Sequence, residues 1–188
     1  MQLKGNLKWK QNGETIAGGN GYGDKLNQLK YPCGIYVDYE EKCIYIADFQ
    51  NHRIVKWKLD GGSDHGQIVA GGNGEGNKID QLNWPTDMIL DEKNKSLIIS
   101  DYGNRRVVRW SLQNTNDKQI LIENISCSRL MLNENGDLFV SDYANHSVKR
   151  WRKTEIGKGG EGRIVAGGNG QGNQLNQLNT PTNIFIDR

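Results

Sequence analysis

The sequence has few of the residues that cross-link or interrupt a chain, and it has no long apolar stretch. Among 188 residues there are three Pro, three Cys and three His. No run approaches the roughly 18 apolar residues that a membrane helix needs. The opening residues, MQLKGNLKWKQNG, contain no apolar core of a signal peptide. We therefore expect no membrane association for this chain.

The three cysteines are too few and too far apart for a disulfide framework. The segment YPCGIYVDYEEKCIYIAD has the pattern of a β-hairpin turning at residues 39–42, which pairs Asp38 with Cys43 and Cys33 with Asp48. The two thiols then lie about 16 Å apart along the strands, at ~3.3 Å per residue. A disulfide needs Cα atoms within about 7 Å. We predict free thiols and, from them, a cytoplasmic location.

Motifs for metal binding and covalent catalysis are also missing. No HxH, HExxH, CxxC or GxSxG sequence occurs. His52 and His146 share a repeat position with Arg105, and a position that accepts either His or Arg is not a metal ligand. The sequence thus predicts no metal, no cofactor and no catalytic residue.

Glycine, by contrast, is abundant, with 24 residues, and it clusters in a stretch that occurs three times. The copies are AGGNGYGDKLNQLKYP at residues 17–32, AGGNGEGNKIDQLNWP at 70–85 and AGGNGQGNQLNQLNTP at 166–181. A phosphate loop would need Lys-Ser/Thr at a fixed spacing and a helix after it, and neither follows. Three copies instead predict a joint between structural repeats, in which glycines supply positive φ.

Other residues repeat in the same register. Spacings of 53 and then 41 residues separate two sets of markers: Trp57, Trp110 and Trp151, and Asp48, Asp101 and Asp142. Between them lie apolar runs of 5 to 7 residues, such as CIYIAD and RVVRW, with polar turns such as YEEK. These runs are too short for helices and are rich in strand-forming residues. The chain is therefore predicted to be all-β, a β-propeller of four-stranded antiparallel blades.

The repeat resembles the NHL family, whose pattern is roughly Pro-x-Gly-Ile-x-Val-Asp, a strand ending in Ala/Ser-Asp, and Asn-His-Arg-Ile/Val. The matching segments are PCGIYVD with IADFQNHRIVKW, PTDMILD with ISDYGNRRVVRW, and VSDYANHSVKRW. The third copy has Ser147 in place of Arg and lacks the Pro-x-Gly entry. The resemblance covers nearly the whole chain and implies a propeller like the NHL domain of tripartite-motif-type proteins. Such propellers mostly bind proteins or single-stranded RNA.

The repeat spacing predicts a single domain that is an arc of a propeller. Full blades are expected at about 32–71, 85–123 and 129–167, with a partial blade at 1–18 and the first strand of a further blade at 181–188. We hypothesise that the arc belongs to a larger propeller. The bare faces of its end blades predict self-association.

Several repeated residues are interpreted as structural. The Asp and Asn side chains are expected to bond turn backbone, with Asp also pairing the Arg five residues on. Each Trp is expected to pack between blades, with the preceding Lys or Arg lying along the next blade. A basic stripe for nucleic acid is the alternative for those cations. The structural positions are Asp48, Asn51, Asp101, Asn104, Asp142, Asn145, Trp57, Trp110 and Trp151.

Binding is expected at the turns between the second and third strands of each blade. These turns share a face with the long glycine-rich stretches, because alternate loops of a meander lie on the same side. Aromatic residues beside cations suit the stacking of single-stranded bases or the anchoring of a peptide. The alternative is that the aromatics pack beneath the long loops. We name this set the loop rim: Phe49, His52, Arg53, Tyr102, Arg105, Arg106, Tyr143 and His146.

The sequence therefore predicts a non-catalytic binding or scaffold module for a protein or single-stranded RNA. One alternative is the substrate-recognition part of a tripartite-motif-like ubiquitin ligase. Its catalytic domain would lie outside this chain, because no RING or B-box Cys/His cluster occurs here. A propeller lyase or lactonase is less favoured, since it needs convergent metal ligands that the sequence does not show.

Overall fold

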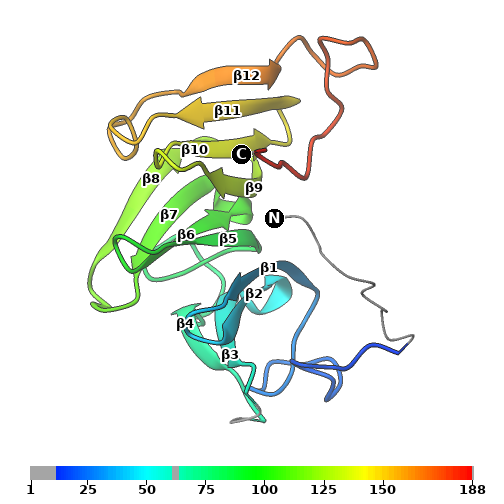
Figure 1. The fold of residues 1–188 in the computed structure, drawn as a ribbon, viewed down its shortest axis with the longest axis vertical. Coiled ribbons are helices and arrows are strands. Elements are labelled where there is room, and N and C mark those ends of the chain that lie inside the picture. The colour runs from blue at the N-terminus through cyan, green and yellow to red at the C-terminus, as the bar shows by residue number, and fades with distance from the viewer. Residues whose placement is uncertain (1–11, 61–63, 188) are drawn as a thin grey trace, which may run out of the picture.

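The computed structural model describes residues 12–60 and 64–187, which form three antiparallel four-stranded sheets (Figure 1). This confirms the predicted all-β architecture of propeller blades. In this part of the chain no helix is long and apolar enough to cross a bilayer. Blade 1 contains β1 (Pro32–Asp38), β2 (Cys43–Asp48), β3 (Arg53–Lys58) and β4 (Gln67–Gly71); blade 2 contains β5 (Pro85–Asp91), β6 (Ser96–Asp101), β7 (Arg106–Ser111) and β8 (Lys118–Glu123); blade 3 contains β9 (Cys127–Leu132), β10 (Leu138–Asp142), β11 (Ser147–Trp151) and β12 (Arg163–Gly167).

The blades follow one another in an arc, with their first strands side by side. In Figure 1, blade 1 lies at the bottom, blade 2 in the middle and blade 3 at the top. Strand β5 contacts both β1 and β9, so the three first strands line the inner side of the arc. Within each blade, every strand pairs with the next one along the chain. The turns before and after a given strand therefore lie on opposite faces of the molecule.

Two apolar layers hold the blades together. Alternate residues of a strand point to opposite faces, so adjacent residues of β6 serve different layers. Ile99 packs with Trp110 against blade 1, whereas Ile98 packs against blade 3. Trp151 lies in the second layer. Trp57 packs with Val55 on the other face of blade 1, covered by Ala17 and Leu29. The predicted burial of the three Trp side chains is confirmed.

The register of the first hairpin was predicted only in part. Asp38 pairs with Cys43 as expected, but Pro32, and not Cys33, pairs with Asp48. An irregularity between Pro32 and Ile35 shifts the strand by one residue. A similar shift follows Pro85 in blade 2, so the bulge belongs to the repeat.

All three cysteines are free, and they differ in accessibility. Cys33 is exposed, whereas Cys43 and Cys127 are buried. Burial raises the pKa of the Cys127 thiol to about 12, and its Sγ contacts the Arg106 carbonyl at 3.2 Å. Because the thiolate is the reactive form, we expect a maleimide to modify Cys33 alone in the folded chain. Intact-mass measurement should show one fast adduct, and none in Cys33→Ser. Fast labelling of a second thiol would contradict the fold.

The predicted partial blades at the two ends are described only in part. Most of residues 1–18 lie outside the described residues. Residues 181–187 are not part of a strand, and no described segment pairs with them. They do lie against blade 3. The Ser141 hydroxyl donates to the Thr182 carbonyl at 3.2 Å, and Arg129 Nε donates to Asn183 Oδ1 at 2.9 Å. This segment therefore lies alongside the first two strands of blade 3, and its place in a further blade remains a prediction.

The outer face of blade 3 is less covered than the same face of blade 1. Phe139 and Val148 are half-buried, whereas Tyr45 and Ile54 at the equivalent positions are 1% and 0% exposed. Phe185, which follows blade 3 in the chain, is 83% exposed. Association through this apolar face remains a prediction.

Candidate functional site

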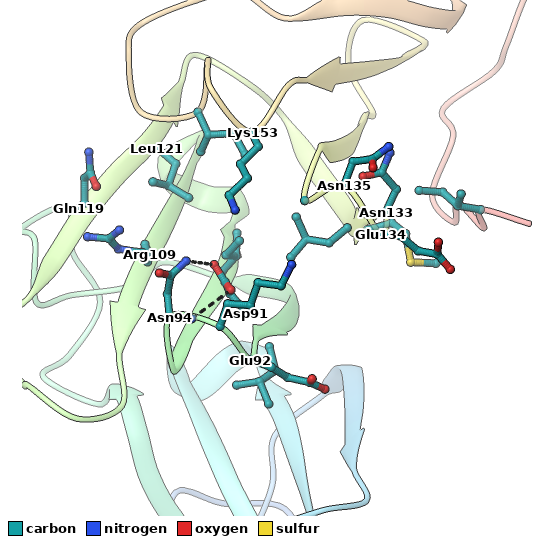
Figure 2. Close-up of a pocket in the computed structure, with 18 of the residues that line it drawn as sticks. Asp91, Glu92, Asn94, Arg109, Gln119, Leu121, Asn133, Glu134, Asn135 and Lys153 are labelled. Atoms are coloured by element: carbon teal, nitrogen blue, oxygen red, sulfur yellow. Dashed lines mark hydrogen bonds between the residues drawn. The ribbon is translucent and has the colours of Figure 1, made fainter. Parts of the chain in front are cut away.

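A cleft of about 980 Å³ lies between blades 2 and 3, where the turns joining the first and second strands are found. Its apolar part includes Leu121 and Ile156, and its polar part includes Arg109. Figure 2 shows Asp91 and Asn94 bonded to each other, with Lys153 extending toward them from blade 3. Asn94 Nδ2 donates to Asp91 Oδ2 at 2.6 Å. Three cations and four carboxylates line the cleft, so its charge favours no simple anion or cation.

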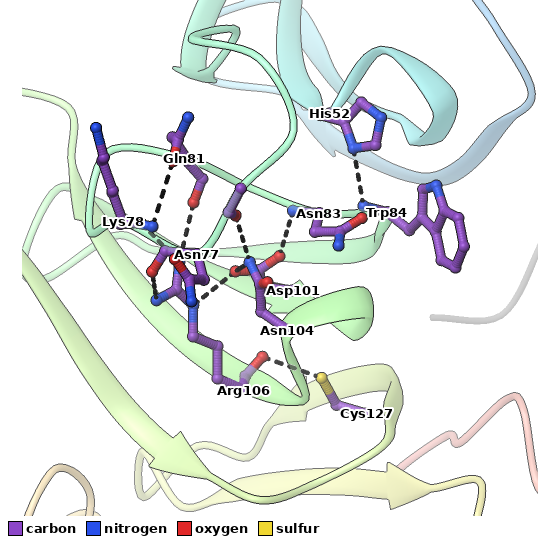
Figure 3. A network of polar contacts seen from close by, with 11 residues as sticks. His52, Asn77, Lys78, Gln81, Asn83, Trp84, Asp101, Asn104, Arg106 and Cys127 are labelled. Carbon is purple, nitrogen blue, oxygen red and sulfur yellow. Dashed lines mark hydrogen bonds and ion pairs between the residues drawn. The ribbon is translucent and has the colours of Figure 1, made fainter.

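The opposite face carries the loop rim, and here three side chains of blade 2 hold the glycine-rich stretch that precedes the blade (Figure 3). Asp101 ends β6, and Arg106 begins β7. Between them the 3-10 turn η2 (Tyr102–Asn104) places Asn104 beside both. Asp101 Oδ2 accepts from Asn104 Nδ2 at 2.8 Å and from Arg106 Nε at 2.6 Å. Asp101 Oδ1 accepts the N–H of Asn83 at 2.7 Å.

The same side chains satisfy carbonyls of the stretch. Arg106 donates to the carbonyls of Asn77, Lys78 and Gln81, each at 2.9 Å, and Asn104 Nδ2 donates to Gly76 at 2.8 Å. Blade 1 repeats this arrangement with Asp48, Asn51 and Arg53, which bond the N–H of Lys30 and the carbonyls of Gly23, Asp24, Lys25 and Gln28. The stretch is therefore a joint fixed by its blade.

The glycines allow the backbone path that these bonds require. Gly72 and Gly74 both have φ +81°, in the left-handed region that a side chain disfavours. A Cβ on Gly76 would collide with Oε1 of Gln81. We call residues 70–85 and their equivalents the glycine-rich joint from here on.

Two arginines of the loop rim are therefore not available to a partner. Arg53 and Arg106 are 4% and 6% exposed, and their guanidinium groups are committed to the joint. The prediction that these two arginines contact a partner is wrong. The sequence does not reveal which main-chain carbonyls lie beside each guanidinium group, so it could not show that both are buried. The predicted pairing of each Asp with the Arg five residues later is confirmed in these two blades.

The two histidines of the loop rim also fasten joints. His52 and His146 adopt left-handed φ values of 53° and 50°. Nδ1 of His52 lies 3.3 Å from the N–H of Trp84, and Nδ1 of His146 lies 3.1 Å from the N–H of Thr180. Each histidine side chain thus accepts a hydrogen bond from the end of the joint that follows its own blade. Arg105, in the same position with φ 54°, has no joint after it and is exposed. The sequence contained this signal, since His occurs where a joint follows.

The aromatic residues divide into two groups. Phe49 stacks on Trp84 with ring centres 5.9 Å apart, so it packs against the joint as the alternative prediction held. Tyr102 and Tyr143 meet edge to face at 6.4 Å, between blades 2 and 3, where no joint lies. Tyr143 is 37% exposed. We call Tyr102, Arg105 and Tyr143 the rim cluster.

Neither surface brings together the ligands of a metal centre. Within residues 12–60 and 64–187 no three His, Cys, Asp or Glu side chains form a group that could hold a metal ion. The buried Asp48, Asp101 and Asp142 belong to separate blades, and the first two are occupied by the joints.

Comparison with solved structures identifies the class of fold. The chain is similar to a chain in the crystal structure of a nidogen/laminin complex, with 17% identity and a TM-score of 0.58, covering 74% of this chain and 49% of that one. It thus spans about half the length of that neighbour. A streptogramin B lyase structure is similar at 10% identity and a TM-score of 0.47, covering 71% and 39% of the two chains. That weaker likeness indicates nothing about activity.

The chain is a β-propeller protein by its blades and by the first of these neighbours. No family model matches the sequence, and no curated protein matches it either. The resemblance to NHL repeats in particular therefore remains a prediction.

Proposed function

We propose that the chain is a non-catalytic binding module that takes a protein partner on the rim cluster. The observation that carries this proposal is the ring pair of Tyr102 and Tyr143, at the one blade boundary in the described chain without a joint. The exposed Arg105 lies on the same turn as Tyr102, whose carbonyl accepts the Arg105 N–H at 3.0 Å. Tyr and Arg are the residue types that dominate binding energy at protein interfaces. A similar fold in a nidogen/laminin complex is in keeping with a protein partner.

Single-stranded RNA is less favoured on the same surface. Its backbone requires several accessible cations, and each phosphate contact adds to the salt dependence of binding. Arg53 and Arg106 are buried in ion pairs, which leaves Arg105 as the exposed arginine of the loop rim. Two tyrosines and one arginine suit a peptide anchor better than a phosphate track.

The first test selects peptides for binding to the full chain from a random display library. Their affinities are then measured for the wild type, Tyr102→Ala and Arg105→Ala. We expect each variant to weaken binding by about tenfold or more, as for interface anchors that contribute above ~1.4 kcal/mol.

The control is Lys93→Ala, which removes an exposed cation from the cleft on the opposite face and is expected to leave affinity unchanged. Peptides that depend on Lys93 and ignore Tyr102 would place the site in the cleft and refute the proposal. Short unstructured RNAs, titrated at two salt concentrations, are expected not to bind. Tight, salt-sensitive RNA binding would replace the protein partner with RNA.

A further inference from the structure

Blade 3 keeps the residues that hold a preceding joint, although no joint precedes this blade. The third repeat is shorter than the second by 12 residues, and the glycine-rich stretch is what it lacks. Asp142 still ends the second strand, and Asn145 Nδ2 still donates to Asp142 Oδ2, at 2.7 Å. Asp142 is 0% exposed, like Asp48 and Asp101.

Two substitutions accompany the missing joint. Ser147 stands where Arg53 and Arg106 stand in the other blades. Lys149 stands where blades 1 and 2 have Val55 and Val108, and its Nζ lies 3.2 Å from Asp142 Oδ2. The ammonium group therefore replaces the charge of the missing guanidinium.

This replacement leaves two buried oxygens without a partner. Within the described residues, Asp142 Oδ1 and Ser147 Oγ form no hydrogen bond, although both atoms are buried. In blades 1 and 2 the same carboxylate oxygen accepts a joint N–H, at 2.6 and 2.7 Å. Ile125 occupies the corresponding place before blade 3, but its N–H goes to the Arg105 carbonyl at 3.0 Å. A buried acceptor without a donor is costly, so the group lacking here is a main-chain N–H.

We propose that a glycine-rich turn of a partner protein takes the place of the missing joint in blade 3. This inference rests on the proposed function, because the vacant position lies next to Tyr143 of the rim cluster. The partner's main chain donates an N–H to Asp142 Oδ1, and its carbonyls accept from Asn145 Nδ2 and Lys149 Nζ. Asn145 and Tyr143 are exposed, and the Lys149 side chain is 20% exposed, so these side chains lie at the solvent edge of the position. Asp142 Oδ1 itself is buried in the unbound chain, so the partner's turn has to displace the atoms that cover it.

The chemistry of the partner segment follows from the joints already present. Their path needs positive φ at two glycines, Gly72 and Gly74, and at Gly76 a Cβ would have to displace the end of the Gln81 side chain. A segment with side chains at these places cannot follow the same path without strain. The partner is thus a peptide turn with closely spaced glycines and unpaired main-chain groups.

The experiment uses a fluorescent peptide with the sequence of residues 70–85, AGGNGEGNKIDQLNWP, and the full chain. Fluorescence anisotropy is expected to show saturable binding to the wild type. Asn145→Ala should weaken it by about tenfold, because a main-chain contact and the orientation of Asp142 are lost. Asn51→Ala makes the same change in a blade whose joint is present, and it should leave the affinity unchanged. A peptide with Ala at the three glycine positions should not bind.

A gain of affinity provides a test that misfolding cannot imitate. The double variant Ser147→Arg/Lys149→Val gives blade 3 the residues of blades 1 and 2. Its arginine can donate to the peptide carbonyls as Arg106 does to Asn77, Lys78 and Gln81. We expect the affinity to rise by about tenfold or more, as charge-assisted hydrogen bonds are the stronger kind.

The outcomes separate this inference from the proposed function. No binding of the peptide to the wild type and to the double variant would overturn the inference, as would equal effects of Asn145→Ala and Asn51→Ala. Library peptides that still depend on Tyr102 would in that case leave the proposed function standing. Peptide binding that responds to the double variant but not to Tyr102→Ala would support the vacant joint position and reject the rim cluster.

Discussion

Arg106→Met is expected to destabilise the chain by about 3–5 kcal/mol, the usual cost of removing one member of a buried ion pair. The substitution leaves the Asp101 carboxylate, which is 0% exposed, without its cation. It also removes the donor to three joint carbonyls. Met keeps most of the aliphatic length of the Arg side chain. The loss of stability therefore measures the polar interactions of Arg106 more than its packing. Denaturant unfolding of the full chain measures the change.

The adjacent residue supplies the control. Arg105→Met removes the same charge from an exposed position, and we expect a change within about 0.5 kcal/mol. A similar loss for both variants would show that Arg106 acts through net charge and not through the joint. A loss at Arg106 below about 1 kcal/mol would mean that water satisfies the joint carbonyls instead.

The blade architecture was predictable because it depends on local patterns that recur. The spacing of Trp57, Trp110 and Trp151 is the same as that of the Asp residues, and short apolar runs fill each interval. Periodicity, however, does not reveal a bulge. The shift between Pro32 and Ile35 changes the partner of Asp48 without altering the composition of the strand, so Cys33 was placed one residue out of register.

The roles of the loop-rim residues were harder to predict, because they depend on main-chain atoms far along the sequence. Arg106 bonds carbonyls 25 to 29 residues earlier, and nothing in the segment DYGNRR distinguishes it from the exposed Arg105. Their positions relative to the joints do distinguish them. Arg begins the third strand only where a joint precedes the blade, and His caps the turn only where a joint follows it.

The cleft could not be predicted from any one motif. Its lining comes from all four strands of blade 2, from β9, from three connecting segments and from residues 185–187. These segments meet only when the blades pack at a particular angle. Arg109 lines the cleft, but its Nη2 pairs with Asp117 of its own blade at 3.3 Å. That Arg109 lies along the neighbouring blade remains a prediction.

Trp110→Ala is expected to cost about 3–5 kcal/mol, the range for truncating a large aromatic in a core. Trp110 is 5% exposed and packs with Tyr45 and Ile99 in the layer between blades 1 and 2. Trp84→Ala is the control, because that ring is 43% exposed and mainly stacks on Phe49; it should cost about 0.5–1.5 kcal/mol. Denaturant unfolding of both variants tests the assignment. Equal losses would mean that blades 1 and 2 are held together by the joint and not by their apolar layer.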